Sequence, residues 1–166
     1  LHNVAHSFPT RRSSDLVAAL VVAGVNPVYD APRTLEFAAA LAKVPLVVSL
    51  ADRVDETAAH ADFLAPASHP FESWGDHALG GQTVALQQPV IRPLYDTHGL
   101  IDLLVTWGAA AGVGGAVQQA ALQAQAEIGK PPRTAATSPA YHYVRAHWLA
   151  HVVPTEAAWD EEIGRA

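Results

Sequence analysis

Two short segments, each at the end of an apolar run, are the part of the sequence best suited to bind a ligand. Gly24-Val25-Asn26-Pro27 follows the valine-rich run 17–23, and Ser49-Leu50-Ala51-Asp52 closes the run that begins at Leu46. Glycine permits close approach of a ligand to the backbone, and an asparagine amide can hydrogen-bond to a ribose or a phosphate. A tight strand-to-helix turn explains the first segment equally well. The segment matches neither the GxGxxG nor the Walker pattern, so it does not support ordinary dinucleotide or nucleoside triphosphate binding.

A second group of chemically capable side chains lies between residues 67 and 81. His69, Glu72, Asp76 and His77 are of the types that ligate metals. A metal site needs several such ligands to converge on one point, and spacing within a loop does not establish that. We therefore interpret these four residues as solvated loop groups that hydrogen-bond to the backbone.

Two further patterns are weaker still. His147 and His151 are four residues apart and share one face of a helix, but without a third ligand they are interpreted as a surface pair. Asp55-Glu56-Thr57 is more typical of a helix cap than of a general acid–base group. No serine has the context of a nucleophile elbow. The sequence therefore predicts neither catalytic nor metal-ligating residues.

A β-α-β unit is expected to position the two candidate ligand-binding segments. Runs 17–23 and 46–50 predict two buried strands, and an apolar stripe over 35–42 predicts a helix between them. Asp30 is the expected cap of that helix, with Pro32 in its first turn. Strands joined in this way are parallel, with a right-handed crossover. Both segments then lie at the carboxyl ends of strands, where open α/β sheets bind ligands.

The rest of the chain predicts further short elements and then helices. A short helix at 56–60 and a strand at 62–65 precede a loop at 67–81 and a strand at 83–87, and the predicted helices are 98–111, 116–128, 140–152 and 154–163. The expected fold class is α/β, with a Rossmann-like parallel β-α-β core. The predicted domains are an α/β domain of residues 17–112 and a helical extension of residues 113–166 with a linker at 129–139.

Composition excludes several classes of function. The 166 residues, 50% of them apolar, suit one domain with a hydrophobic core. A formal net charge of -6, with Lys43 and Lys130 the two lysines, argues against nucleic-acid binding. The sequence has no cysteine, so these residues form no disulfide, cysteine-ligated zinc site or iron–sulfur cluster. No apolar run reaches the roughly 20 residues of a membrane span.

The N-terminal residues have a different character. Residues 6–16 resemble the translation of a common short-read sequencing adapter, with SFPTRRSSDL at 7–16. We therefore treat residues 1–16 as an artefactual or disordered N-terminus and exclude them from fold reasoning. The alternative is a basic arm in which Arg11 and Arg12 contact phosphates. On the first interpretation, the chain is expected to be a fragment of a larger protein.

The order and spacing of the motifs between Val17 and Gly112 resemble those of the molybdopterin oxidoreductases of the dimethyl sulfoxide reductase type. The matching elements are VVAGVNP at 21–27, LVVSL at 46–50, DETAAHADFLAP at 55–66 and ESWGD at 72–76. That family carries a GxNP turn, a strand ending in Gln-Asp, an ETAxxADxxLP segment and an ExxG element in this order. The resemblance implies one α/β half of a site for a pterin guanine dinucleotide.

Carried over by position, the cofactor-binding residues are Gly24, Asn26, Pro27, Ser49, Leu50 and Ala51, with Asp52 beside them. The chain departs from the family because Gln-Asp falls on Leu50-Ala51. A carboxylate there pairs with the guanine edge through charge-assisted hydrogen bonds, whereas Leu50 and Ala51 offer only backbone groups. Each unmet group on a buried base costs about 1–3 kcal/mol. We therefore expect a vestigial site, unless a register shift brings Asp52 into position.

The departure points to a subfamily. The stretches at 45–50, 55–58, 69–76 and 83–95 resemble the large periplasmic subunit of alternative complex III, a membrane-bound quinol-oxidising complex of bacterial respiratory chains. That subunit keeps the molybdoenzyme fold, lacks the molybdenum cofactor and carries iron–sulfur clusters in a separate domain. The resemblance implies a cofactor-free structural platform that contacts the other subunits of the complex on the periplasmic side of the bacterial inner membrane.

Two alternatives stay open. The first is part of a catalytically active molybdenum oxidoreductase that binds molybdopterin guanine dinucleotide at the same positions. The second is a small stand-alone α/β binding module with an unrelated ligand. If the chain is the structural platform, electron transfer and the iron–sulfur clusters belong to parts of the parent protein outside this fragment.

Overall fold

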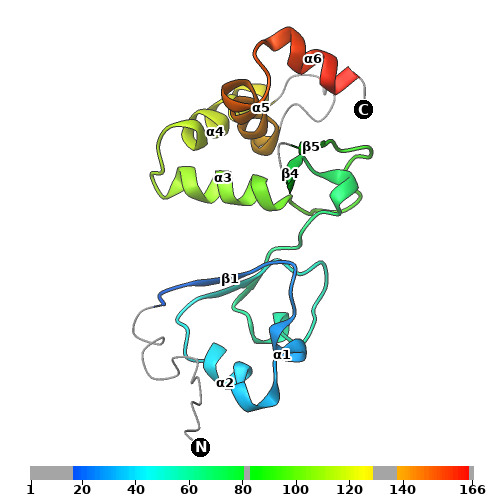
Figure 1. The fold of residues 1–166 in the computed structure, drawn as a ribbon. Coiled ribbons are helices and arrows are strands. Elements are labelled where there is room, and N and C mark those ends of the chain that lie inside the picture. Colours follow the sequence, from blue (N-terminus) through cyan, green and yellow to red (C-terminus); the bar gives the residue numbers. More distant parts are fainter. Residues whose placement is uncertain (1–16, 81–82, 129–137, 165–166) are drawn as a thin grey trace, which may run out of the picture. The chain divides into compact units, whose positions relative to one another are not determined.

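The chain forms two compact units, and the sequence boundary between them falls between Ala67 and Ser68 (Figure 1). The computed structural model describes residues 17–80, 83–128 and 138–164. The adapter-like N-terminal peptide and most of the predicted linker at 129–139 lie outside these described residues.

Three short parallel strands form the sheet of the first unit. They are β1 (Leu20–Val22), β2 (Val47–Ser49) and β3 (Phe63–Leu64), in the spatial order β1-β2-β3. Leu20 is in register with Val47 on β2. The α/β fold class and the parallel pairing of the two strands that flank the candidate site are thus confirmed. The strands are shorter than the apolar runs that predicted them.

The connection from β1 to β2 is three short helices, not the one that the apolar stripe predicted. They are α1 (Pro27–Asp30), η1 (Arg33–Leu35) and α2 (Phe37–Leu41). Proline at the first helical position begins α1, so Asp30 ends this helix and the predicted cap is wrong.

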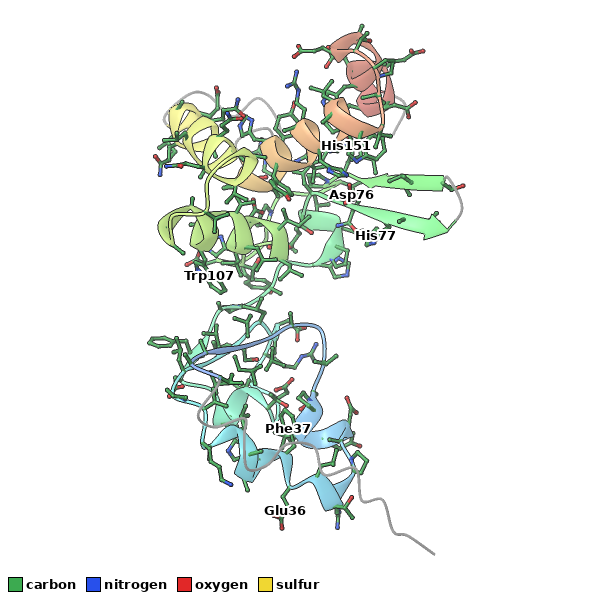
Figure 2. The ribbon with its side chains drawn as sticks, turned by 60° about the vertical axis from the view of Figure 1, so that its left-hand side comes forward. Glu36, Phe37, Asp76, His77, Trp107 and His151 are labelled. Carbon is green, nitrogen blue, oxygen red and sulfur yellow. The ribbon has the colours of Figure 1, made fainter. Side chains whose placement is uncertain are left out.

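Backbone conformation explains why the connection is broken twice. Ala31 is extended, as expected before a proline, and separates α1 from η1. Glu36 has a left-handed backbone with φ 45° and separates η1 from α2, which begins at Phe37 (Figure 2). Apolar periodicity continues across both breaks, and this is why the sequence suggests one helix.

The core of the first unit lies against one face of the sheet. The short η2 helix (Ala58–His60) connects β2 to β3. The buried apolar side chains come from β1, α2, β2, the residue after β2, and η2: Val22, Leu41, Val47, Leu50 and Ala58. Two polar side chains of this unit, Ser49 and Thr57, are also buried.

The second unit combines a hairpin with four helices. The η3 helix (Pro70–Glu72) precedes β4 (Gly75–Gly80), which pairs antiparallel with β5 (Thr83–Gln87). The helices are α3 (Leu100–Ala110), α4 (Ala116–Glu127), α5 (Pro139–His151) and α6 (Glu156–Gly164). None of the helices within the described ranges is long and apolar enough to cross a membrane.

Aromatic packing forms the core of the second unit. Val144, Trp148 and Trp159 form a buried cluster, and the rings of Trp148 and Trp159 meet edge-to-face with centroids 5.9 Å apart. Ser138 caps α5 by accepting a hydrogen bond from the Tyr141 N–H at 3.1 Å. The predicted linker therefore ends before Pro139, the first residue of α5.

One expectation for this unit differs from the structure, and a second is left open. The predicted loop at 67–81 contains η3 and β4, because β4 is stabilised by pairing with β5 and has little strand signal of its own. The domain boundary predicted after residue 112 falls between α3 and α4, which pack against each other and against α5. Compact packing does not define the domains of a larger protein, so the predicted domain division stays a prediction.

Candidate functional site

The structure places the two candidate segments at the carboxyl ends of neighbouring parallel strands. Gly24, Asn26 and Pro27 follow β1, and Leu50 directly follows β2. The Leu50 N–H donates to the Val22 carbonyl at 2.8 Å, which joins the two strand ends. The sheet edge on which ligand binding was predicted is therefore formed as the topology requires.

Asn26 is held by a hydrogen-bond cluster, centred on the buried Thr57, that the sequence did not predict. Its Oδ1 accepts hydrogen bonds from the Thr57 hydroxyl at 2.6 Å and from the Thr57 N–H at 3.2 Å. Its Nδ2 donates to Glu56 Oε2 at 2.7 Å. Thr57 is fully buried, and its hydroxyl also accepts from the Val28 N–H at 3.0 Å. Most of the bonding capacity of the Asn26 amide is thus used inside the protein.

Glu56 and Thr57 are therefore structural partners of the turn after β1. Asp55 contributes separately, because its Oδ1 accepts a hydrogen bond from the Ala58 N–H at 2.7 Å at the start of η2. This contact confirms the capping interpretation of Asp55. In the sequence, Asn26 and Thr57 belong to two separate motifs, which follow each other in a fixed order. Nothing in either motif indicates that the two residues are in contact.

The position of Gly24 favours glycine because its backbone is in the left-handed region. Its φ is +67°, and a Cβ placed on it meets no atom within 4 Å. Space around the residue is therefore not the constraint, whereas the left-handed backbone is. Gly24 redirects the chain out of β1 so that Asn26 reaches Thr57.

The residues at the carboxyl end of β2 and just after it offer few free groups to a ligand. Ser49 and Leu50 are both only 2% exposed. The Ala51 N–H donates to Ser49 Oγ at 3.3 Å, which uses the hydroxyl as a local acceptor. Asp52 is exposed and pairs with the Arg53 guanidinium at 2.7 Å. Of the candidate residues in this segment, Asp52 alone presents an exposed charged side chain.

Two carboxylates near these strand ends have lowered pKa values. The Arg53 guanidinium donates to Asp52, and this bond lowers the pKa of the Asp52 carboxyl. The Asn26 amide donates to Glu56 and lowers the pKa of the Glu56 carboxyl. Both groups are ionised at neutral pH, so neither is suited to act as a general acid there.

A pocket in this unit lies along the helices that connect β1 to β2. It has a volume of about 520 Å³ and is formed mainly by α1, η1 and α2, with Val28, Arg33 and Glu56 among its lining residues. None of its lining residues is one of the predicted cofactor-binding residues.

The four side chains considered as metal ligands have separate hydrogen-bond partners. His69 Nδ1 accepts from the Phe71 N–H at 3.1 Å, and Glu72 Oε2 accepts from the His69 N–H at 3.2 Å, which together cap η3. Asp76 accepts from the Trp148 indole N–H at 3.0 Å, and His77 contacts Gln87 at 3.1 Å. Asp76 and His77 follow each other along β4 (Figure 2).

The interpretation of His69 and Glu72 as groups that bond to the backbone is confirmed, whereas Asp76 and His77 bond to other side chains. His147 and His151 do share one face of α5, with ring centroids 4.8 Å apart. No group of three or more His, Cys, Asp or Glu residues converges on one point in the part of the chain that the structure describes.

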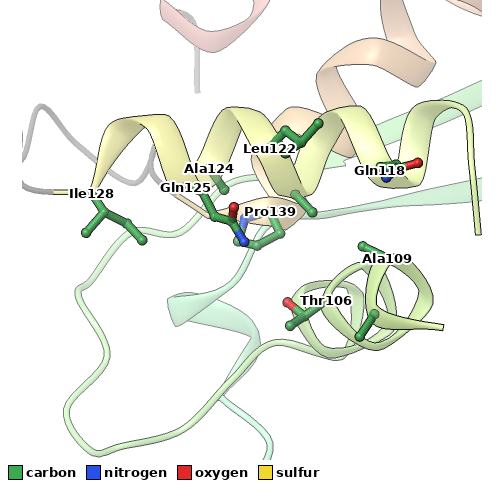
Figure 3. A pocket seen from close by; sticks show the side chains of 10 residues that line it. Thr106, Ala109, Gln118, Leu122, Ala124, Gln125, Ile128 and Pro139 are labelled. Atoms are coloured by element: carbon green, nitrogen blue, oxygen red, sulfur yellow. The ribbon is translucent and has the colours of Figure 1, made fainter. Parts of the chain in front are cut away.

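The second unit also contains pockets that sequence reasoning did not anticipate. One, of about 460 Å³, lies along α3 and α4 and is lined by small and apolar side chains such as Ala109 and Leu122 (Figure 3). Another, of about 690 Å³, includes Trp74, Trp107 and Asp102 in its lining. Burial raises the pKa of the Asp102 carboxyl, although the Ala140 N–H donates to it at 2.8 Å.

Comparison with known proteins supports a molybdopterin oxidoreductase-like relationship. The chain is 35% identical, over 99 residues, to the molybdopterin-binding-like subunit of menaquinone reductase from Nitratidesulfovibrio vulgaris Hildenborough. The match covers 57% of this chain and 14% of that relative, so the chain spans a small part of the relative's length. No protein-family model matches the chain. This similarity supports the broad molybdopterin oxidoreductase-like class that the motifs indicated. It does not specifically indicate alternative complex III.

Proposed function

We propose that this chain is part of a molybdopterin-binding-like subunit in a complex that exchanges electrons with the quinone pool, and that it serves there as a cofactor-free structural platform. The similarity to a menaquinone reductase subunit supports the class of complex. The observation that carries the platform role is the state of Leu50, whose side chain is buried where the related enzymes present a polar guanine-binding residue.

The groups around the strand ends do not fit a guanine dinucleotide. The Leu50 N–H is bonded to the Val22 carbonyl and the Ala51 N–H to Ser49, so two backbone donors at the guanine-reading positions are already paired. The Asn26 carbonyl oxygen accepts two hydrogen bonds from Thr57. A buried guanine left without partners loses about 1–3 kcal/mol for each unmet group. Binding would require these internal bonds to break first.

The platform role has consequences for partners and location. The subunit contacts the other subunits of its complex, and the iron–sulfur clusters that carry electrons belong to other parts of the parent protein. Its place is the periplasmic side of the bacterial inner membrane, as in alternative complex III, and it is held at the membrane through its partners. Whether the complex oxidises quinol or reduces quinone depends on those partners.

One observation favours a second candidate, an active molybdenum oxidoreductase. Asp52 is an exposed, ionised carboxylate one residue beyond the expected guanine-reading position, with Arg53 as its partner. If Asp52 left Arg53, it could pair with the guanine edge through charge-assisted hydrogen bonds. This candidate therefore depends on Asp52, and the platform role does not.

The two candidates are separated by Asp52→Ala in the subunit purified within its complex. The platform role predicts that quinone-linked electron transfer stays unchanged. The matched control is Asp96→Ala, another exposed aspartate, located in the second unit. Loss of electron transfer with Asp52→Ala and not with Asp96→Ala contradicts the platform role and supports the molybdenum enzyme.

A further inference from the structure

One face of the parallel sheet carries a row of apolar side chains that no segment of the described first unit covers. Val21, Val48 and Phe63 are in register across β1, β2 and β3, so they point to the same face. Val21 is 44% exposed, Phe63 is 64% exposed and Val48 is half-buried. The opposite face carries Val22 and Ser49, which are both buried. Parallel sheets are normally covered on both faces, so this arrangement is incomplete.

The topology explains why the described helices of the first unit do not cover that face. The strands follow one another in the order β1-β2-β3, so both connections advance in the same direction. Parallel strands are joined by right-handed crossovers, and two right-handed crossovers in one direction lie on the same face. The helices α1 and α2 and the short η2 therefore belong to the face of Val22 and Ser49. The face of Val21, Val48 and Phe63 can be covered by a crossover that advances in the opposite direction, from β1 away from β2.

The outer edge of β1 points to the same missing segment. The Leu20 N–H donates to the Leu46 carbonyl, and the Val22 carbonyl accepts from the Leu50 N–H. In a parallel ladder alternate residues bond to a given neighbour, so the N–H and carbonyl groups of Val21 face away from β2. Among the described residues, no strand pairs with this edge of β1. Natural proteins rarely leave such an apolar edge open.

We propose that the row formed by Val21, Val48 and Phe63 is the docking surface for an amphipathic helix of the same polypeptide, which leads to or from a further parallel strand beside β1. The proposal rests on the proposed function in one respect, namely that the chain is part of a larger subunit. The matched relative is long enough to contain such a helix and strand, since the aligned 99 residues are 14% of its length. The helix is expected to carry an apolar stripe, because it packs on three apolar side chains.

Two neighbouring residues of β3 give a matched test in the full-length subunit within its complex. Phe63→Cys places a thiol on the open face, and Leu64→Cys places one on the opposite face, where Leu64 is 37% exposed. Maleimide labelling of each thiol is measured by peptide mass spectrometry in the native and in the urea-unfolded subunit. The ratio of the two rates removes the intrinsic reactivity of each thiol.

The exposed fractions predict opposite orders with and without the docked helix. If nothing covers the face, Phe63→Cys is labelled faster than Leu64→Cys. With the helix docked, we expect the order to reverse, with Phe63→Cys protected by about tenfold or more relative to the unfolded subunit. Rapid labelling of Phe63→Cys in the native subunit overturns the proposal.

A photo-crosslinker at position 63 identifies the occupant. We expect it to crosslink to a peptide of the same polypeptide that has helical apolar periodicity. A crosslink to another subunit overturns the proposal, because it makes the face an intersubunit contact. These outcomes do not depend on the metal or guanine content of the subunit, so failure of the proposed function and failure of this inference are distinguishable.

Discussion

The two units of the chain are stabilised by different kinds of contact. In the first unit, the turn after β1 is fixed by hydrogen bonds of Asn26 to Thr57 and Glu56, residues about 30 positions away. In the second unit, apolar and aromatic side chains around Trp148 and Trp159 form the core. All four tryptophans of the sequence lie in the second unit.

The contrast between the units supports the proposal that the candidate site is a remnant and not a working ligand site. Where a fold binds a ligand, polar groups at strand ends are left unpaired for that ligand. Here the polar groups of the first unit bond to one another around the buried Thr57. On the proposed role, this cluster stabilises the turn in place of a ligand. The second unit needs no such cluster because its apolar core is larger.

The largest effect is expected in the aromatic core. Trp159 is fully buried, so Trp159→Ala should lower the free energy of unfolding by about 3–5 kcal/mol. Trp159→Phe should cost clearly less, because it keeps a ring and removes an indole N–H that has no hydrogen-bond partner in the described structure. Urea unfolding followed by far-ultraviolet circular dichroism measures both variants. Equal losses for Ala and Phe would show that ring packing is not what Trp159 contributes.

The next effect concerns the polar cluster of the first unit. Thr57→Val keeps the shape of the side chain but removes the hydroxyl that bonds to Asn26 and to the Val28 N–H. Each buried group left unmet costs about 1–3 kcal/mol, so the first unit should be markedly destabilised. Thr57→Ser keeps the hydroxyl and is the control. Hydrogen exchange at the Val28 amide should accelerate in the Val variant only; unchanged exchange would mean that the cluster does not stabilise this turn.

A smaller, pH-dependent effect is expected at Asp102. Burial raises the pKa of its carboxyl above the ordinary 3.8, so the folded chain holds this proton more strongly than the unfolded chain does. The contribution of Asp102 to stability is therefore lost as pH rises from about 3.8 through the raised pKa. Asp102→Asn keeps an acceptor for the Ala140 N–H but does not ionise, so its stability does not fall in this way as the pH rises. The Tm advantage of the variant over the wild type should grow with pH across this range; an advantage that shrinks with pH would reverse the assigned direction.

The smallest effect is expected at the surface pair of the first unit. Asp52 and Arg53 are both largely exposed, and solvent screens the attraction between such charges. Asp52→Ala should therefore leave the urea midpoint unchanged, in contrast to Thr57→Val a few residues away. A clear fall in the midpoint would show that Asp52 has a structural role in addition to its contact with Arg53.

Elements with a local signal were predicted well. The strand at 83–87 and the helices of the second unit differ from the structure by a few residues at most, because apolar periodicity and turn residues report on each element separately. The parallel pairing of β1 with β2 followed from the helical connection between them. Both candidate segments were therefore placed correctly at strand ends.

Features that depend on contacts between distant residues were not predicted. β4 is a strand because β5 lies beside it, and its own glycine- and histidine-containing sequence suggested a loop. The bond between Asn26 and Thr57 joins residues 31 positions apart, and no periodicity reports such a contact. The breaks at Ala31 and Glu36 depend on backbone conformations that a continuous apolar stripe conceals.

The central claim is that the strand ends of the first unit have kept their fold and lost their ligand. The most direct test is the content of molybdenum, tungsten and acid-released guanine nucleotide in the full-length subunit, purified with its complex and active in quinone-linked electron transfer. The platform role predicts that neither metal nor guanine nucleotide accompanies the subunit. Roughly stoichiometric metal and guanine in the same preparation would contradict it, and would make Gly24, Asn26 and Ser49 cofactor-binding residues with Asp52 the candidate guanine partner.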